Sequence, residues 1–533
     1  MRELVKKYEI AKEDAVRFMK SGQIGDYFKA LLEMKKNLLS LLILLILFSC
    51  QKNEYPLVIS PVITSGDTGI DLVENTGAGQ TVYTITTSST LEINGYYLNG
   101  QDADLLSLND NLVTLDANPD FETKSSYRFG VTAYDIDGNI SNLKTVTFSI
   151  IDVDETPPYV LESCENGFAG EYPCNDYDLV AHIDLDALGG PGASGNDCWG
   201  WTDPSTGKEY ALVGVSTGTS FVDLSDLEFP RVVGFLPTHT VSSSWRDIKT
   251  YGNYAFIVSE ATDHGMQVFD LTRLGTVDAN SPPVTFTADA HYDGFGKAHN
   301  IVINESQGYA YAVGTTTYNG GPHFVDISNP LNPLAAGGYG DDSYSHDAQV
   351  ITYNGPDSDY TGREILIGSN QNRVVIVDVT DKLNPTQIST INYSNIGYTH
   401  QGWFTEDFNY FILGDELDEI NFGGNTRNIV FDFSDLNNPS LHMDYYGPTT
   451  AIDHNGYVNG SEYYLANYAA GIRIIDISNI GNQTMSEVGY FDTYPENDNA
   501  SFNGVWNVYP YFSSGNIIIS DINRGFFVVR KSL

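Results

Sequence analysis

The segment VVIVDVTDKLNP, residues 374–385, decides the fold, because related segments recur through the C-terminal part of the chain. Each of the first six copies is a short, largely β-branched run that ends in Asp, and a Ser or Thr usually follows two residues later. The copies lie at 219–230, 266–274, 322–333, 374–385, 428–439, 472–482 and, in degenerate form, 525–533. They are spaced by 44 to 56 residues, the length of one four-stranded propeller blade.

The repeat predicts how each blade is built. An inner strand such as WRDIKTYG (245–252) comes first, a second strand such as YAFIVSE (254–260) follows, and the repeat is the third strand. A fourth strand has the form of RVVGFLPT (231–238). The last copy ends at its third strand, whereas a fourth-strand segment, DYDLVAHIDL (176–185), precedes the first blade. We therefore predict an all-β, seven-bladed propeller over 160–533, closed by strands from both ends.

The repeats resemble those of LVIVD-repeat propellers. Longer stretches resemble the choice-of-anchor B family, and the resemblance covers about 170–533: NDCWGWTDPSTGKEYALVG (196–214), SSWRDIKTYGNYAFIVSE (243–260), HGMQVFDLTRL (264–274) and YTHQGWFTEDFNYFILGDELDE (398–419). That family pairs one domain with varied surface anchors. The resemblance implies no established activity.

Residues 35–50, KKNLLSLLILLILFSC, have the basic start and apolar middle of a signal peptide, here assigned to 34–50. The end at Cys50 resembles a bacterial lipobox, which implies that Cys50 is lipidated and becomes the mature N-terminus. The resemblance implies a lipid-anchored protein of the cell envelope, at the outer membrane or cell surface. The alternative is a transmembrane anchor, but the apolar run 38–48 is too short to span a bilayer.

Residues 1–33 have the pattern of an amphipathic helix pair. Met34, followed by two lysines, is a natural start for the signal peptide. The first 33 residues are therefore either a mis-assigned start or a genuine extension, and the sequence leaves both open.

Residues 51–157 predict a small β-sandwich, because 80–88, 126–135 and 144–152 alternate as strands. The segment resembles a cadherin repeat. The resemblance implies a Ca²⁺ site formed by Glu74, Asp120, Glu122, Asp135, Asp152 and Asp154. Two features depart from the family: the exit reads D-V-D-E-T, and Thr86-Thr87-Ser88 replaces an acidic D-x-D. The alternative is an immunoglobulin-like spacer whose acidic residues are only solvated.

Aligned inner strands predict a polar channel mouth. Four successive blades begin with histidine, namely His299, His346, His400 and His454. The same column holds Trp199, Arg246 and Asn503 in the other blades. The next column holds Asp247, Asn300, Asp347, Gln401 and Asn455. The ends of the second strands lie at the same mouth, because the strands are antiparallel, and they carry Glu260, Asn370, Asp415, Glu416, Asn467 and Asp521.

Two interpretations of this mouth remain open. One is a functional site that binds a ligand or a transition metal, because imidazoles with neighbouring carboxylates are common metal ligands and general bases. The predicted ligand site comprises Arg246, Asp247, Glu260, His299, His346, His400, His454, Asp415 and Asp521. The catalytic candidates are His299, His346, His400, His454, Asp347 and Glu416. The other interpretation is structural, with these side chains tying blades together. In the functional case unperturbed imidazoles would make binding change between about pH 5 and 8.

The composition limits the partners. The formal charge is −42, from 69 acidic and 27 basic residues, which disfavours nucleic acid and favours divalent cations. Cys164 and Cys174, ten positions apart, are expected to form a disulfide, and Cys198 to be a buried thiol. We expect a calcium-binding recognition or adhesion module for a protein or carbohydrate ligand. The alternative, less expected, is an exported metal-dependent hydrolase or lyase.

Overall fold

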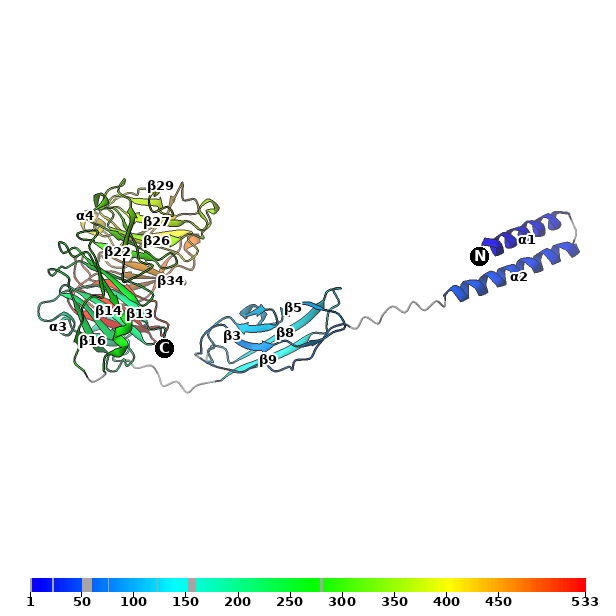
Figure 1. The fold of residues 1–533 in the computed structure, drawn as a ribbon, viewed down its shortest axis with the longest axis horizontal. Coiled ribbons are helices and arrows are strands. Elements are labelled where there is room, and N and C mark those ends of the chain that lie inside the picture. Colours follow the sequence, from blue (N-terminus) through cyan, green and yellow to red (C-terminus); the bar gives the residue numbers. More distant parts are fainter. Residues whose placement is uncertain are drawn as a thin grey trace. The chain divides into compact units, whose positions relative to one another are not determined.

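The computed structural model describes residues 2–21, 24–49, 60–74, 76–121, 123–151, 160–278 and 281–533. The chain divides into two compact units, Met1–Pro157 and Pro158–Leu533. The first holds two helices and a β-sandwich, and the second is the propeller (Figure 1).

The N-terminal helices are α1 (Arg2–Ser21) and α2 (Ile24–Ser49), which pack against each other. Their buried residues are small, namely Ala11, Ala15 and Ala30. Helix α2 runs through Met34 into the segment predicted as a signal peptide, and Cys50 lies outside the described residues. Within the described part of the chain, we find no helix with the length and apolarity needed to cross a membrane.

The sandwich consists of two main sheets around one apolar core. One sheet has the strand order β2 (Leu72–Val73), β9 (Lys144–Ile151), β8 (Ser126–Asp135), β5 (Ile93–Asn99). The other has the order β3 (Gln80–Thr84), β7 (Leu112–Leu115), β6 (Leu106–Asn109). A separate two-stranded sheet is formed by β1 (Val62–Ile63) and β4 (Thr87–Ser88). Val82, Phe129 and Val146 are almost fully buried between the sheets, as the period-2 alternation predicts.

The propeller has seven antiparallel sheets, numbered here as blades 1–7 in chain order. The innermost strands are β13 (Gly195–Thr202), β17 (Arg246–Tyr251), β22 (Asn300–Asn304), β26 (Asp347–Thr352), β30 (Thr399–Phe404), β34 (Gly456–Asn459) and β38 (Val505–Tyr509). The second strands are β14 (Glu209–Val215), β18 (Tyr254–Ser259), β23 (Tyr309–Val313), β27 (Glu364–Ser369), β31 (Tyr410–Asp415), β35 (Glu462–Ala466) and β39 (Ile517–Asp521). The third strands are β15 (Gly218–Asp223), β19 (Met266–Asp270), β24 (His323–Asp326), β28 (Val374–Asp378), β32 (Arg427–Asp432), β36 (Ile472–Asp476) and β40 (Gly525–Lys531). The fourth are β16 (Arg231–Pro237), β21 (Ala290–Tyr292), β25 (Leu334–Gly338), β29 (Thr386–Ile391), β33 (Ser440–Tyr446), β37 (Ser486–Phe491) and β12 (Tyr177–Ile183).

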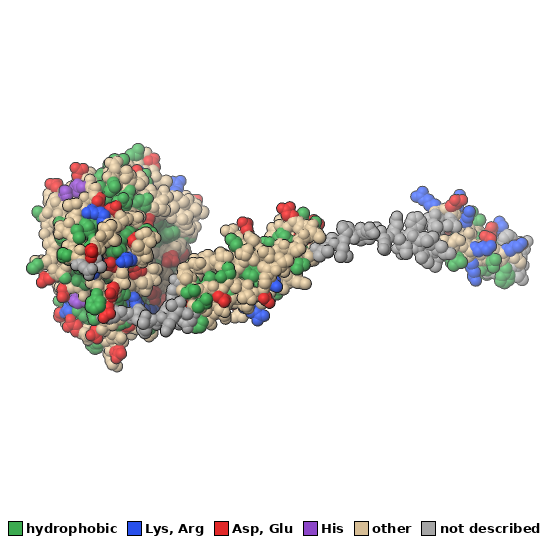
Figure 2. All heavy atoms as spheres, turned by 60° about the horizontal axis from the view of Figure 1, so that its bottom comes forward, with side chains coloured by type: hydrophobic (Ala, Val, Ile, Leu, Met, Phe, Trp, Pro, Cys, Tyr) green, Lys and Arg blue, Asp and Glu red, His purple; other side chains and the backbone are tan. Residues whose placement is uncertain are grey.

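The predicted fold is therefore confirmed, and all seven repeats are third strands. Each innermost strand contacts that of the next blade, and β38 contacts β13, so these strands surround a central channel. Acidic side chains, with fewer basic ones between them, are scattered over the visible face of the propeller (Figure 2).

The Asp of the repeat ends the third strand by a local hydrogen bond. The Asp378 carboxylate accepts from the backbone N–H of Thr380 at 3.0 Å, and Asp326 accepts from Ser328 at 2.9 Å. The same bond occurs at Asp223, Asp270, Asp432 and Asp476. Such Asx turns reverse the chain toward the fourth strand, which explains why Asp is followed by Ser or Thr two positions later.

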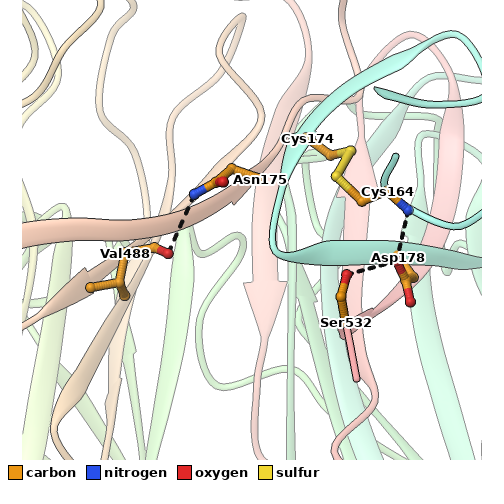
Figure 3. Close-up of a disulfide and its surroundings, with 6 residues drawn as sticks. All are labelled: Cys164, Cys174, Asn175, Asp178, Val488 and Ser532. Atoms are coloured by element: carbon orange, nitrogen blue, oxygen red, sulfur yellow. Dashed lines mark hydrogen bonds between the residues drawn. A yellow bond between two sulfur atoms is a disulfide. The ribbon is translucent and has the colours of Figure 1, made fainter. Parts of the chain in front are cut away.

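Closure of the ring joins the two ends of this unit. Strand β12 pairs antiparallel with β40, from Tyr177 opposite Lys531 to Ile183 opposite Phe526. The segment that precedes β12 holds the Cys164–Cys174 disulfide, beside which the Asp178 carboxylate accepts from Cys164 N–H and Ser532 Oγ–H, both at 2.7 Å (Figure 3). Figure 1 shows the C-terminal strands in red beside β13 and β14. In addition, β11 (Tyr172–Asn175) extends blade 6 by pairing with β37, and β10 (Phe168–Ala169) pairs with β11.

The closing strand should contribute measurably to stability. Leu179 on β12 is 3% exposed, so we expect Leu179→Ala to lower the free energy of unfolding by about 2–5 kcal/mol through lost burial and a residual cavity. Leu383, 80% exposed, is the matched control, and Leu383→Ala should change it by less than about 0.5 kcal/mol. Denaturant titration of both variants measures the difference, and equal effects would contradict the role of β12.

Candidate functional site

Four histidines form a continuous row at one mouth of the channel. The ring centroids of His299 and His346 are 4.1 Å apart, those of His346 and His400 4.4 Å, and those of His400 and His454 4.3 Å. At His400 the inner strand contains a β-bulge. Thr399 pairs with Asp415 and Gln401 with Gly414, so His400 is an additional residue with no partner in the ladder, and the bulge changes the direction of its side chain. The predicted column of histidines thus comes together in space.

Hydrogen bonds to neighbouring blades fix which ring nitrogen faces the site. His346 Nδ1 lies 3.2 Å from the carbonyl oxygen of His400, and His454 Nδ1 lies 2.5 Å from that of Trp506. A carbonyl only accepts, so Nδ1 carries the hydrogen and Nε2 presents its lone pair. Metal-ligating histidines are held in this way, with the other ring nitrogen bonded to a carbonyl or carboxylate. Among the described residues, His400 Nδ1 has no hydrogen-bond partner and is buried.

Glu416 places a carboxylate between two of these rings. Its Oε2 lies 3.8 Å from His400 Nε2 and its Oε1 lies 3.8 Å from His454 Nε2, while the Tyr468 hydroxyl donates to Oε1 at 2.8 Å. A separation of 3.8 Å is too long for a hydrogen bond. It is close to the ~3.3–3.6 Å between two ligands that share one tetrahedral zinc ion. One ligand atom from each of the three residues lies within 4.8 Å of the others.

At the end of the row, His299 is paired with a carboxylate. Its Nδ1 lies 2.7 Å from Glu260 Oε1, and Lys297 contacts the other oxygen at 3.2 Å. The hydrogen bond from His299 lowers the pKa of Glu260. His299 and Glu260 lie at the mouth as predicted, but the Glu260 carboxylate already has Lys297 and His299 as partners.

Burial keeps the inner rings neutral. Burial, with the adjacent imidazoles, holds the pKa of His346 and of His400 well below the usual value, and lowers the pKa of His454 to about 3. Burial also raises the pKa of Glu416. Burial therefore argues against the expected change between pH 5 and 8 at His346, His400 and His454, because desolvation penalises the charged ring.

The second column serves mainly to connect blades. Asp197 and Asp247 accept from the backbone N–H groups of the next inner strand, at Ile248 (2.8 Å) and Ile301 (2.6 Å). Lys249 Nζ lies between the two carboxylates, at 3.5 Å from Asp197 and 2.6 Å from Asp247. Asp247 thus connects two blades through these contacts, as the structural interpretation expects.

Other members of this column are also engaged. Gln401 accepts from Gly456 N–H at 3.0 Å and so links blades 5 and 6. Asp347 accepts from Ala348 N–H at 2.6 Å, and burial together with the Asp247 charge raises its pKa to about 8. Neither residue joins the His400–Glu416–His454 group.

Three other predicted site residues are used within the fold. Asp415 is fully buried and accepts from the Tyr393 hydroxyl (2.8 Å) and loop N–H groups. Asp521 accepts from the Thr493 hydroxyl at 2.6 Å, and Arg246 is buried with its guanidinium on Val215 O and His264 Nε2, both at 3.3 Å. The side chains of these three residues are thus held by hydrogen bonds within the fold, and none of them joins the His400–Glu416–His454 group.

The alignment of the first column fails in two blades. In blade 7 Val505 pairs with Asp521 and Asn507 with Ser520, so Trp506, not Asn503, corresponds to His400. In blade 1 the pairing shifts between Gly195 and Cys198, which puts Asn196 rather than Trp199 at that position. Each bulge inserts an extra residue into the inner strand, so equivalent positions no longer lie at the same distance from the start of the strand in the aligned sequences.

Trp199 belongs to the opposite half of the channel. There a cavity of about 210 Å³ is lined by Trp199, Lys249, Thr250, Val302, Ile303, Glu305, Gln349, Val350, Ile351 and Trp403. Lys249 Nζ lies 4.5 Å above the Trp199 ring. Sequence reasoning missed Lys249, although Asp247 and Lys249 are two residues apart and so face the same side of one strand.

The predicted Ca²⁺ ligands of the sandwich fall into two groups. The Glu74 carboxylate accepts from Phe121 N–H at 2.9 Å, and Glu74 N–H donates to Ile151 O at 3.3 Å, so Glu74, the Asp120 loop and the domain exit lie at one end. Asp135 ends β8, which runs antiparallel to β9, so it lies at the opposite end and binds the N–H groups of its own turn. Its assignment to this site was wrong. Glu122, Asp152 and Asp154 lie outside the described residues.

Comparisons with known proteins give only distant solved structures. No family model and no curated protein matches this sequence. A protein from Lactobacillus plantarum aligns with a TM-score of 0.41 and 12% identity over 61% of this chain and 87% of its own. The C-terminal WD40 domain of Sif2 aligns with 0.40 and 9%, over 67% and 85%, and human protocadherin-24 EC1-2 with 0.17 and 15%, over 20% and 49%. The propeller assignment therefore stands on the strand pairing itself, and the family resemblance remains a prediction.

The neutral histidines give a pH prediction. In metal-free protein we expect the rings of His346, His400 and His454 to remain neutral from pH 8 to 5, as read from NMR shifts of the ring carbons. Unfolded histidine takes up a proton near pH ~6.5, so stability from these rings is lost as pH falls below that value toward the lowered folded pKa. An inner ring that titrates between pH 6 and 7 in the folded protein would contradict the burial argument.

Proposed function

We propose that this protein is a metal-dependent binding module of the cell envelope. A divalent transition metal ion is held at the channel mouth by His400, His454 and Glu416, and a protein or carbohydrate ligand reaches the ion from solvent. The observation that carries the proposal is the pair of 3.8 Å separations between Glu416 and the two Nε2 atoms. The lipobox resemblance supports the envelope location.

The donor set favours zinc-like ions over calcium. Two neutral imidazole nitrogens and one carboxylate are the ligands of many catalytic zinc sites, whereas Ca²⁺ takes six to eight oxygens. The rings need not lose a proton before binding, because burial already keeps them neutral. The backbone contact of His454 Nδ1 supplies the second-shell support that such ligands require.

One feature favours a second candidate, an exported metal-dependent hydrolase or lyase. Three protein ligands leave a fourth tetrahedral position open, and a water bound there acquires a pKa near 7 in zinc enzymes. Hydrolysis of simple esters or lactones by the full chain, abolished by chelator and by Glu416→Gln, would favour this candidate over a binding module.

The sandwich is proposed to bind Ca²⁺ near its exit through Glu74, Asp120, Glu122, Asp152 and Asp154. Glu74 and the Asp120 loop share the end from which the chain leaves β9, and this supports the proposal. Carboxylates gathered at one end of a domain are hard oxygen donors suited to Ca²⁺.

Metal binding by the full chain tests the channel-mouth proposal. We expect calorimetry to detect one Zn²⁺ per chain, with the affinity reduced at least about 10-fold in His400→Ala, His454→Ala and Glu416→Gln. His442→Ala is the matched control, because His442 lies on the outermost strand of blade 5, where its ring packs on Tyr410 and its Nε2 lies 2.7 Å from Ile480 O. Circular dichroism confirms that each variant is folded. Absence of transition-metal binding, or equal affinity in all four variants, would rule the site out.

The anchor is tested separately. If Cys50 is lipidated, mass spectrometry of protein from membranes should find an acylated Cys50 as the first residue, and Cys50→Ser should release the protein from the membrane fraction or leave it unprocessed. A mature N-terminus at any other residue would contradict the lipobox assignment.

A further inference from the structure

A second group of buried acids lies between blades 5 and 6. Asp418 and Glu419 begin the short helix α4 (Asp418–Phe422), which follows β31, and Asp453 precedes β34. Asp418 and Glu419 are each 5% exposed and Asp453 is fully buried. One carboxylate oxygen from each lies within 4.8 Å of the other two.

Each carboxylate has one oxygen held by the protein and one without a donor. Glu419 Oε1 accepts from Arg427 N–H at 3.0 Å, Asp418 Oδ2 lies 3.5 Å from Arg427 Nη1, and Asp453 Oδ2 accepts from Asn428 Nδ2 at 2.8 Å. The remaining oxygens, Asp418 Oδ1, Glu419 Oε2 and Asp453 Oδ1, are buried and have no hydrogen-bond partner in the described part of the chain.

Asn428 provides an independent sign of a missing ligand. It is not acidic, it is fully buried, and its amide nitrogen holds its head group against Asp453. Its Oδ1 is buried and lacks a partner among the described residues. A buried amide oxygen without a partner is costly, so Asn428 Oδ1 requires either a hydrogen-bond donor or a cation at this place.

The charges of this cluster do not balance. Three carboxylates face one guanidinium, that of Arg427, which also pairs with Asp444 at 2.9 Å. The carboxyl groups of Asp418 and Glu419 lie within hydrogen-bond reach of each other, so two acidic groups stand side by side in a buried place. The cluster therefore needs either shared protons or a cation: a protonated Asp453 would donate to Asn428 Oδ1, whereas a cation would bind the oxygens of all four residues.

We propose that Asp418, Glu419, Asp453 and Asn428 bind a Ca²⁺ ion. All four donors are oxygens, the ligands that Ca²⁺ prefers, and two oxygens 2.3–2.6 Å from one ion can lie up to about 4.6–5.2 Å apart. The ion joins α4 of blade 5 to the loop before β34 of blade 6. Because Glu416 is two residues before Asp418, the same ion would orient the loop that carries Glu416, although the ligands of the calcium site are separate from those of the channel-mouth metal.

Calcium binding by the full chain tests this site. Calcium per chain is measured by equilibrium dialysis with elemental analysis, for the parent, Glu419→Gln and, as a second variant, Asp453→Asn. We expect each of the two variants to bind one equivalent of Ca²⁺ fewer than the parent. Glu74→Gln is included to account for calcium in the sandwich and should keep the propeller equivalent. Asp186→Asn, which removes an exposed helical acid of blade 1, should change nothing.

Thermal melts separate a cation from shared protons. With Ca²⁺ present, Glu419→Gln should lower the Tm of the propeller by several degrees; with chelator it should leave the Tm unchanged or raise it, because one of three repelling carboxylates is gone. Unchanged calcium stoichiometry in both variants, or a raised Tm with and without calcium, would overturn the proposal in favour of shared protons. His400→Ala removes a proposed Zn²⁺ ligand and should leave the number of bound Ca²⁺ ions unchanged. This variant therefore distinguishes failure of the zinc proposal from failure of the calcium proposal.

Discussion

The pairing of β12 with β40 is the constraint on which the rest of the propeller depends. It joins a strand that precedes blade 1 to the last strand of the chain, so that blade 7 is built from both ends. Once the ring is closed, the seven inner strands must lie side by side around one axis. Residues at the start of each inner strand are then neighbours, even though they are about fifty residues apart in sequence. A histidine repeated in four blades becomes a row of rings in contact.

Two adjacent columns divide the work at the channel mouth. The residues of the second column, such as Asp197 and Asp247, satisfy backbone N–H groups of the next blade and hold the inner strands together. Two residues of the first column also bond to the next blade, since His346 and His454 each direct one ring nitrogen at a backbone carbonyl there. That bond leaves the other nitrogen directed at the site. The structural and functional interpretations of the histidines are therefore compatible, because the contact that connects blades also fixes the tautomer that a metal requires.

The sequence predicted the fold in detail because each third strand repeats the same two signals, an apolar run and an Asx turn. It predicted the histidine row because blades of nearly constant length keep equivalent positions aligned. The alignment failed where bulges add residues, so that Asn503 was chosen in place of Trp506. The sequence also could not predict burial. Asp415 and Asp521 lie at positions expected at the channel mouth, but their carboxylates accept hydrogen bonds from N–H groups of the loops. Asp135 was misplaced because sequence similarity to a Ca²⁺ motif does not reveal which end of a strand a residue occupies.

The acids of α4 had no sequence signal, since Asp418, Glu419 and Asp453 belong to two blades and to no shared column. Their position nevertheless bears on the histidine row. Glu416 is anchored on one side by Tyr468 and on the other by the short loop leading to Asp418. A carboxylate serves as a metal ligand only when it is held in place, because its own rotational freedom is otherwise lost on binding. A charge-neutral, rigid α4 cluster would supply that restraint. An uncompensated one would leave mutually repelling carboxylates two residues from Glu416. If both proposed sites hold metals, the occupancy of the α4 cluster would therefore influence how firmly Glu416 is held beside His400 and His454.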